Sequence, residues 1–158
     1  MKKTVSLILF VFSILIMFVG CGRNNTYIIA TDLNMSPFSS VDSTGAAVGF
    51  EIDIIKEIAA EQGINVEFYP VGYPEALEEI EDGHADVAIA AIIPTDELSQ
   101  KFDFTDIYYN NEYAVAVKKG KNAKFIEMFN EGLSKIKENG KYNEIYSNYF
   151  GNISESAK

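Results

Sequence analysis

Apolar runs of strand length and apolar stripes at helical spacing follow one another along the chain from residue 27 onward. The run Tyr27–Thr31 is β-branched and aromatic, which favours a buried strand, and a loop rich in Ser, Asp and Gly extends to Gly49. Between Glu51 and Gln62 the apolar positions recur at helical spacing, and Gly63 stands where a left-handed helix cap is needed. This part of the pattern predicts a strand, a loop and a helix.

The next segments continue the alternation of strand and helix. Residues Ile64–Phe68 alternate as a strand does, Pro74 begins a second helix, and Gly83 ends it. Val87–Ile93 is a continuous apolar run, as expected of a strand that is covered on both faces. Strands and helices that alternate in this way predict right-handed crossovers and a mainly parallel sheet.

The last part of the chain predicts one more strand, Tyr113–Val117, and two helices, the first of which ends near Gly140. The apolar stripes of the two helices point to a protein core and not to a cofactor site. These stripes are Phe125, Met128, Phe129, Leu133 and Ile136 on the first helix, and Tyr142, Ile145, Tyr146 and Tyr149 on the second.

The amino-terminal end has the composition of an export signal. Two lysines precede the apolar run Val5–Val19, which is shorter than the roughly 20 residues that a membrane-spanning helix needs, although a single membrane anchor is the alternative. The run Phe18-Val19-Gly20-Cys21 resembles a lipoprotein processing site, with the difference that its first position is more often Leu. Such cleavage would free the amino group of Cys21, and acylation by fatty acids such as palmitate would supply a two-chain membrane anchor.

We therefore expect a signal peptide at 1–20, a lipidated tether at 21–26, one folded domain at 27–151 and a tail at 152–158. The protein would be extracytoplasmic and lipid-anchored to the outer face of the cell membrane, as in a Gram-positive bacterium. Cys21 is the only cysteine, so a disulfide within one chain is excluded.

The charge balance restricts the partners. The chain of 158 residues has 13 Lys and Arg against 23 Asp and Glu, a net charge of −10, and the signal segment contains two of the lysines and none of the acids. Nucleic acid and anionic lipid headgroups are therefore poor partners, and membrane contact would be made through the lipid anchor only. The simplest meaning of the charge is a solvated acidic surface.

Several short motifs occur in an order that is typical of one family. The chain resembles the extracellular solute-binding proteins of amino-acid ABC importers, which have a periplasmic-binding-protein type II fold of two α/β lobes. The likeness covers Tyr27 to about Tyr109 and again Tyr113–Gly151. The motifs are Thr31-Asp32 with Pro37-Phe38, Gly49-Phe50-Glu51-Ile52-Asp53, Gly83-His84-Ala85-Asp86, Phe102-Asp103-Phe104-Thr105, and Asn139-Gly140-Lys141-Tyr142 followed by Tyr149-Phe150-Gly151.

One lobe of that fold is missing from the sequence. In the family the chain leaves the first lobe after the tyrosines that match Tyr108 and Tyr109, builds the second lobe, and returns on a strand that matches Tyr113–Val117. Here only Asn110-Asn111-Glu112 fills the gap, which is enough for a turn and not for a domain. The resemblance implies an α/β protein: a single three-layer lobe with a mainly parallel sheet, helices on both faces, and the final helices packed back on it.

The resemblance also implies a set of ligand-binding positions. Asp32 matches an acidic position near the ligand amine, Tyr73 matches an aromatic wall, and Met35 stands where an aromatic ring often stacks on the ligand. The implied positions are Asp32, Met35, Phe38, Tyr73, Ala91, Ile92, Ile93, Thr95 and Leu98.

The sequence departs from amino-acid binders at the segment that should hold the ligand carboxylate. Small or hydroxyl residues are usual at several positions matching Ala90, Ala91 and Ile93, and an arginine matches Leu98, so that only Thr95 keeps the pattern. An arginine–carboxylate pair contributes about 1.5–3 kcal/mol, and the backbone N–H groups near Thr95 would attract an anion only weakly. The ligand that fits best is therefore an amine-bearing or largely apolar small solute.

The changed positions have two interpretations. They form an apolar face that would meet protein, most simply a second copy in a two-fold homodimer through the former cleft face. Alternatively, Ile92 and Ile93 continue a buried strand and Leu98 packs under its own short helix. Transport with an ABC permease is the family-implied role, and a protein-interaction, sensory or vestigial module is the competing one.

An enzyme is the alternative to these binding functions. Some proteins of this fold are dehydratases, but their chemistry also uses the second lobe. The sequence has no nucleophile elbow, and His84 lies in a turn that ends a helix. Asp82, His84 and Asp86 would point in different directions, so they do not predict a metal site. We expect no enzyme activity, no cofactor and no metal.

Overall fold

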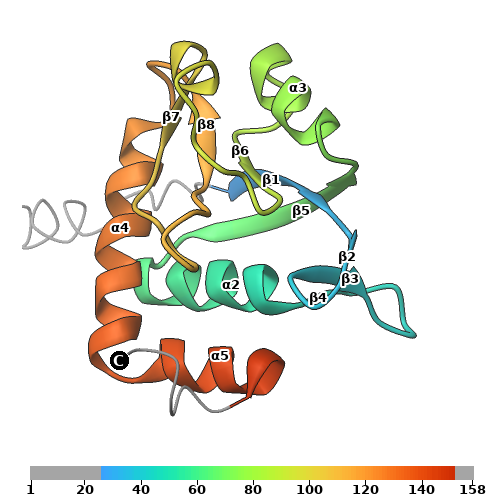
Figure 1. Cartoon of the computed structure of the whole chain (residues 1–158), viewed down its shortest axis with the longest axis vertical. Helices are drawn as coiled ribbons and strands as arrows, with labels where there is room; N and C mark the ends of the chain where they lie inside the picture. Colours follow the sequence, from blue (N-terminus) through green and yellow to red (C-terminus); the bar gives the residue numbers. More distant parts are fainter. Residues whose placement is uncertain (1–25, 152–158) are drawn as a thin grey trace, which may run out of the picture.

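The computed structural model describes residues 26–151, which form one mixed α/β lobe (Figure 1). A five-stranded sheet has the order β5-β1-β6-β8-β7, and a small three-stranded sheet has the order β2-β3-β4. The strands are β1 (Thr26–Asp32), β2 (Asn34–Met35), β3 (Ser39–Val41), β4 (Ala47–Val48), β5 (Asn65–Val71), β6 (Val87–Ile89), β7 (Phe102–Phe104) and β8 (Ala116–Lys118). The helices are α2 (Phe50–Gln62), α3 (Glu75–Asp82), the short 3-10 helix η1 (Leu98–Gln100), α4 (Ala123–Glu138) and α5 (Lys141–Phe150).

The main sheet is parallel in its first half only. Strand β1 pairs in parallel with β5 on one side and with β6 on the other, so that Ile29 lies beside both Phe68 and Val87. Strand β8 runs antiparallel to β6 and to β7. The predicted alternation of strands and helices is confirmed, and the sheet is mixed because β7 and β8 are joined by a turn and not by a helical crossover.

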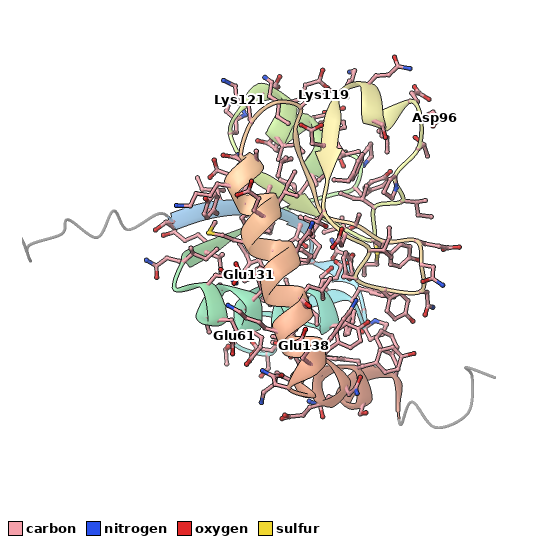
Figure 2. The ribbon with its side chains drawn as sticks, turned by 90° about the vertical axis from the view of Figure 1, so that its left-hand side faces the viewer. Glu61, Asp96, Lys119, Lys121, Glu131 and Glu138 are labelled. Atoms are coloured by element: carbon pink, nitrogen blue, oxygen red, sulfur yellow. The ribbon has the colours of Figure 1, made fainter. Side chains whose placement is uncertain are left out.

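The helices cover both faces of this sheet, which confirms the three-layer arrangement (Figure 1). Helices α2, α4 and α5 build the larger core on one face, where Phe50, Phe125 and Phe129 are almost fully buried. Helix α3 covers the other face, where Leu77 and Ile80 pack on alanines of the sheet. The charged side chains of α4 point outward, as Figure 2 shows for its labelled glutamates.

Helices α2 and α4 approach each other closely at one glycine. A Cβ atom on Gly132 of α4 would lie 2.7 Å from Cγ2 of Ile58 on α2. Gly132 and Ile58 are both buried, so the contact has little room to relax. The glycine therefore sets the spacing of the two helices that form the main layer.

The helices α2 and α3 begin and end where the sequence predicts. Gly63 follows α2 with φ 62° and donates its N–H to the carbonyl groups of the last turn, and Gly83 follows α3 with φ 85°. Pro74 directly precedes the first residue of α3. The predicted stop and start signals are confirmed to within a residue.

Two of the predicted strands are shorter than the apolar runs that suggested them. The run Val87–Ile93 forms a strand only as far as Ile89, because the chain then turns through Ala91 in the left-handed region (φ 47°). The strand expected at Tyr113–Val117 is formed by Ala116–Lys118, and Ala114 donates its N–H to the carbonyl of Ile92 outside the ladder. The loop predicted before Gly49 contains the small sheet β2-β3-β4, which the pattern did not suggest.

Strands β7 and β8 are the two arms of one hairpin, and its tip lies where the second lobe would be inserted. Tyr108 donates its N–H to the carbonyl of Tyr113 (2.9 Å), and Glu112 donates to Tyr109 (3.0 Å). Asn110 and Asn111 both have positive φ, 45° and 57°, as a type I′ hairpin turn requires. The expectation that these polar residues form a turn is confirmed.

The expected signal peptide 1–20, all of the tether except Thr26, and the tail 152–158 lie outside the described residues. Cys21 belongs to that part, so its lipidation stays a prediction. Among residues 26–151 no helix combines the length and the hydrophobicity that crossing a membrane requires.

Candidate ligand-binding edge

The parallel strands bring several of the predicted ligand positions to one edge of the sheet. Asp32 ends β1, Tyr73 follows β5, and the segment that contains Ala91 and Thr95 follows β6. Ligands of open α/β sheets bind outside the carboxyl ends of the strands, and all of these residues lie at those ends. Met35 lies close by in β2, directly after β1.

A buried glutamate fixes the shape of this edge. Glu51, in the first turn of α2, has a relative exposure of 0%. Its Oε1 atom accepts a hydrogen bond from the N–H of Ala91 (2.8 Å) and another from the hydroxyl of Tyr108. Glu51 therefore connects the helix, the left-handed turn after β6 and the hairpin close to its tip.

Burial raises the pKa of Glu51 above its usual range. The hydrogen bonds from Tyr108 and Ala91 lower it, and the negative charge of Asp32 raises it further. Burial and the charge of Glu51 also hold the pKa of Tyr108 well above its ordinary value. Within the described residues the Oε2 atom of Glu51 is buried and has no hydrogen-bond partner. Sequence reasoning used Glu51 only as part of a motif and missed this role; an acidic residue among the buried apolar positions of α2 was the available signal.

Asp32 is held by the turn that follows it. Its Oδ1 atom accepts hydrogen bonds from the backbone N–H of Asn34 (2.9 Å) and from the side-chain amide of the same residue (3.3 Å). These are the hydrogen bonds that the Asp32 side chain makes within residues 26–151, so its Oδ2 atom accepts none there. One oxygen of a half-buried carboxylate is therefore available at the edge to an incoming donor.

Thr95 caps η1. Its hydroxyl accepts a hydrogen bond from the N–H of Leu98 (3.2 Å), and its carbonyl accepts one from Ser99 (2.9 Å). These backbone donors are therefore already satisfied. The weak anion attraction expected near Thr95 would therefore have to use other N–H groups of this segment, and it stays a prediction.

The apolar positions at the edge divide into packed and exposed ones. Ile92 has a relative exposure of 0%, whereas Ile93 has 47% and Tyr73 has 46%. Leu98 is partly buried and packs against the smaller core cluster, which includes Leu77 and Ile80 of α3. Ile92 and Leu98 are thus packed as the second interpretation expects, whereas Ile93 is open to solvent, and pairing through this face stays a prediction.

Phe38 belongs to an aromatic cluster, which we define as Phe38, Phe50, Tyr109, Tyr113, Tyr142, Tyr146, Tyr149 and Phe150. The ring of Phe38 lies 5.0 Å from that of Tyr109 and 5.6 Å from that of Tyr113, so it packs on the hairpin.

Helix α5 locks the tip of the hairpin through this cluster. The rings of Tyr109 and Tyr113 stack at 5.6 Å, and Tyr146 of α5 stacks on Tyr109 at 6.0 Å. Tyr142, also in α5, donates its hydroxyl to the carbonyl of Tyr108 (2.6 Å). The connection that would be a hinge in a two-lobed protein is therefore a packed part of this lobe.

The edge is open and not enclosed. A cavity of about 220 Å³ reaches it and is lined by Pro74, Leu77, Glu97 and Leu98, among others, but not by Asp32. The lobe therefore offers one wall of a ligand site, with a carboxylate, an exposed tyrosine and an exposed isoleucine.

The described residues include no group of three His, Cys, Asp or Glu that could hold a metal ion. His84 is exposed and lies 3.1 Å from a carboxylate oxygen of Glu79. The carboxylate of Asp86 accepts a hydrogen bond from the N–H of Ile28 (3.0 Å), which fixes it to β1.

Comparison with known proteins identifies the family. The family model for bacterial extracellular solute-binding proteins, family 3, matches residues 27–152. The chain is 30% identical over 102 residues to a probable histidine-binding protein of Neisseria gonorrhoeae, a match that covers 65% of this chain and 38% of that protein. It is 32% identical over 100 residues to the amino-acid-binding protein AabA of Dichelobacter nodosus, covering 62% of this chain and 40% of that protein. The chain thus spans about two fifths of the length of these curated relatives.

Solved structures support the same fold. Substrate-binding domain 2 of GlnP from Lactococcus lactis, in an open conformation, superposes with a TM-score of 0.77 at 20% identity, covering 80% of this chain and 96% of that one. An ancestral amino-acid-binding protein described as a precursor of cyclohexadienyl dehydratase superposes with a TM-score of 0.72 at 19% identity, covering 79% of this chain and 95% of that one. Identities this low establish the fold alone. The chain belongs to the bacterial extracellular solute-binding proteins of family 3, and a short hairpin turn takes the place of the family's second lobe.

Proposed function

We propose that this protein is a lipid-anchored extracytoplasmic solute receptor, related to those of amino-acid ABC importers, that binds a small amine-bearing or apolar solute and completes its site by pairing with a second copy. It acts without catalysis or a cofactor. The observation that carries this proposal is the open carboxyl edge of the sheet, where Asp32 has a free oxygen while Tyr73 and Ile93 face solvent.

The chemistry of the edge favours an amine over a carboxylate. Asp32 supplies a negative charge, and Leu98 stands where a guanidinium would bind an acid. The missing arginine pair corresponds to about 1.5–3 kcal/mol, or roughly ten- to a hundredfold in affinity for a carboxylate. The ring of Tyr73 can pack on a hydrocarbon or an aryl group of the solute. An ordinary amino acid should therefore bind weakly to one lobe.

A second copy would replace the water exclusion that the missing lobe provides. Ile93 is open to solvent. Tyr113 is only half-buried, and it lies near Ile93 because the next residue, Ala114, donates its N–H to the carbonyl of Ile92. Apolar and aromatic residues of this kind are enriched at the centre of protein interfaces. Because the aromatic cluster locks the hairpin, the receptor would respond to solute by assembling and not by closing a hinge.

Sedimentation velocity of a soluble form from Gly22 to Lys158 tests the proposal, with and without a panel of amines, amino acids and neutral aryl compounds. We expect a dimer that an amine favours, and a melting temperature that rises with the amine by mass action. Ile93→Asp should give a monomer, and Val41→Asp, a change of another exposed apolar residue, should not. A wild-type protein that stays monomeric at high concentration in the presence of every compound would refute the pairing.

A protein-interaction, sensory or vestigial module is the second candidate, favoured by the burial of Ile92 and the partial burial of Phe38 and Leu98, which reduce the surface left for a ligand. A dimer that forms equally with and without every solute would support it over a receptor. Genes for a permease and an ATPase beside this one would support transport. Incorporation of labelled palmitate that is lost in Cys21→Ser would test the anchor.

A further inference from the structure

The face of the sheet that carries α3 is only partly covered. Helix α3 has eight residues and is about 12 Å long, and it packs over Ala30, Ala88 and Ala116. Beyond its end, Ile28 on β1 and Tyr69 on β5 remain 38% and 41% exposed. Parallel sheets are normally covered on both faces, so an uncovered apolar area in the parallel half of this sheet is a candidate binding surface.

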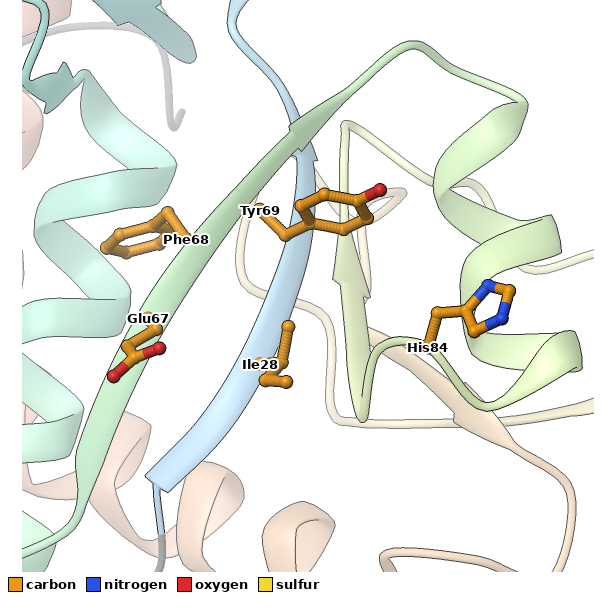
Figure 3. A pocket seen from close by; sticks show the side chains of 5 residues that line it. All are labelled: Ile28, Glu67, Phe68, Tyr69 and His84. Carbon is orange, nitrogen blue, oxygen red and sulfur yellow. The ribbon is translucent and has the colours of Figure 1, made fainter.

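This area is hollowed into a cavity of about 380 Å³, lined by Ile28, Glu67, Phe68, Tyr69 and His84. Figure 3 shows the side chains of Tyr69 and His84 on the α3 side of the strands, with Ile28 on β1 below Tyr69, while Phe68 points toward α2. The volume is at the lower end of the range for small-molecule sites.

The charges around the cavity are unbalanced. Glu67 is an exposed carboxylate in the lining, and His84 is paired with Glu79 at 3.1 Å. The lining contains no lysine or arginine. Lys56 lies 5.9 Å from the ring of Phe68, which points to the other side of the sheet. The cavity thus combines an aromatic ring, an aliphatic floor and a negative charge without an internal cation.

We propose that this cavity binds a small organic cation with an apolar body, at a site separate from the carboxyl edge. The cation would lie between the carboxylate of Glu67 and the ring of Tyr69, where ion pairing and a cation–π contact act together. The hydrocarbon part would cover Ile28 and remove its exposed surface from water. Glu67 and Tyr69 lie in the middle of β5, whereas Tyr73 lies beyond its carboxyl end. The two sites therefore use different residues.

The single histidine of the chain makes the test direct. His84 lines the cavity, so its ring protons give one set of NMR signals that reports on occupancy. Phenethylamine is the probe, and 2-phenylethanol is the matched neutral compound, both titrated at constant pH into the form from Gly22 to Lys158, which contains the whole described lobe. We expect a saturable shift of the histidine signal with the amine, and binding of the alcohol weaker by about fivefold or more.

Variants separate this site from the other one. Tyr69→Ala should weaken amine binding about tenfold, Tyr69→Phe should retain it, and Glu67→Gln should remove most of the preference for the amine over the alcohol. Asp32→Asn, which alters the carboxyl edge, should leave unchanged the shift of the His84 signal during the titration with amine. Tyr69→Phe also guards against a folding defect, because it keeps the ring.

A histidine signal that does not move up to about 10 mM amine would overturn the proposal, because affinity weaker than that is not specific. The same shift in wild type and Tyr69→Ala, or equal affinity for the amine and the alcohol, would also overturn it. A failure here leaves the proposed dimer intact, since the dimer is measured by sedimentation and depends on Ile93.

Discussion

Replacing Glu51 by alanine should destabilise the lobe more than the loss of an ordinary surface carboxylate. Glu51 is fully buried, and its Oε1 atom is the acceptor for the N–H of Ala91 and the hydroxyl of Tyr108. Tyr108 is itself almost fully buried, so its hydroxyl has no solvent to replace the lost acceptor. The left-handed turn at Ala91 would also lose the bond that holds it.

The magnitude follows from the groups left without partners. A buried donor that loses its acceptor costs about 1–3 kcal/mol, and two such donors are created. The substitution also removes a buried carboxyl group whose Oε2 atom has no hydrogen-bond partner in the described lobe, and this stabilising effect offsets part of the loss. We expect the free energy of unfolding to fall by about 2–4 kcal/mol, which is a large part of the roughly 5–15 kcal/mol that a domain of this size has.

The assay is urea unfolding followed by far-UV circular dichroism at neutral pH. Glu61→Ala is the matched control, because Glu61 is an exposed glutamate of the same helix (Figure 2). The control should change the free energy of unfolding by less than about 0.5 kcal/mol. Tyr108→Phe should lie between the control and Glu51→Ala, because it removes one hydrogen bond and leaves no new unpaired donor.

Equal urea midpoints and equal slopes for Glu51→Ala and Glu61→Ala would refute this prediction. That result would mean that the bonds from Ala91 and Tyr108 do not contribute net stability. It would also remove the basis for the left-handed turn at the carboxyl edge.

Three further predictions concern other parts of the lobe. Because burial raises the pKa of Glu51, its contribution to stability is fully present below the ordinary glutamate pKa and is lost as the pH rises through the raised value; the stability of Glu51→Gln relative to wild type should therefore increase as the pH is raised above about 4, measured by urea unfolding at a series of pH values. Gly132→Ala should lower the melting temperature, because overpacking against Ile58 costs about 1–3 kcal/mol and exceeds the helix gain of about 1 kcal/mol; an unchanged melting temperature would contradict the close approach of the helices. Asn111→Val should cost about 1–2 kcal/mol and Asn111→Gly almost nothing in the same assay, because φ is 57°; equal effects would contradict the type I′ turn.

Much of the fold could be read from the sequence because the signals are local. The spacing of apolar residues gave the strands and helices of the parallel half, and Gly63 and Gly83 marked helix ends because their positive φ angles suit glycine. The turn at Asn110-Asn111 was predictable because three polar residues are enough for a turn and too few for a domain, which leaves no room for a second lobe there. Asp32, Tyr73 and the segment after β6 were placed at one edge because parallel strands bring their carboxyl ends together.

Contacts between distant segments decided the rest. Ile92 and Ile93 are neighbours in one apolar run, yet one is buried and the other is exposed, because Glu51, 40 residues before Ala91, takes the N–H that would continue the strand. Phe38 packs on the hairpin because α5, near the end of the chain, closes around both. The cavity beside Tyr69 exists because α3 is too short to cover the sheet. Spacing along the chain fixes which side chains share a face of one element, whereas the burial of that face depends on which elements, far apart in sequence, pack against it.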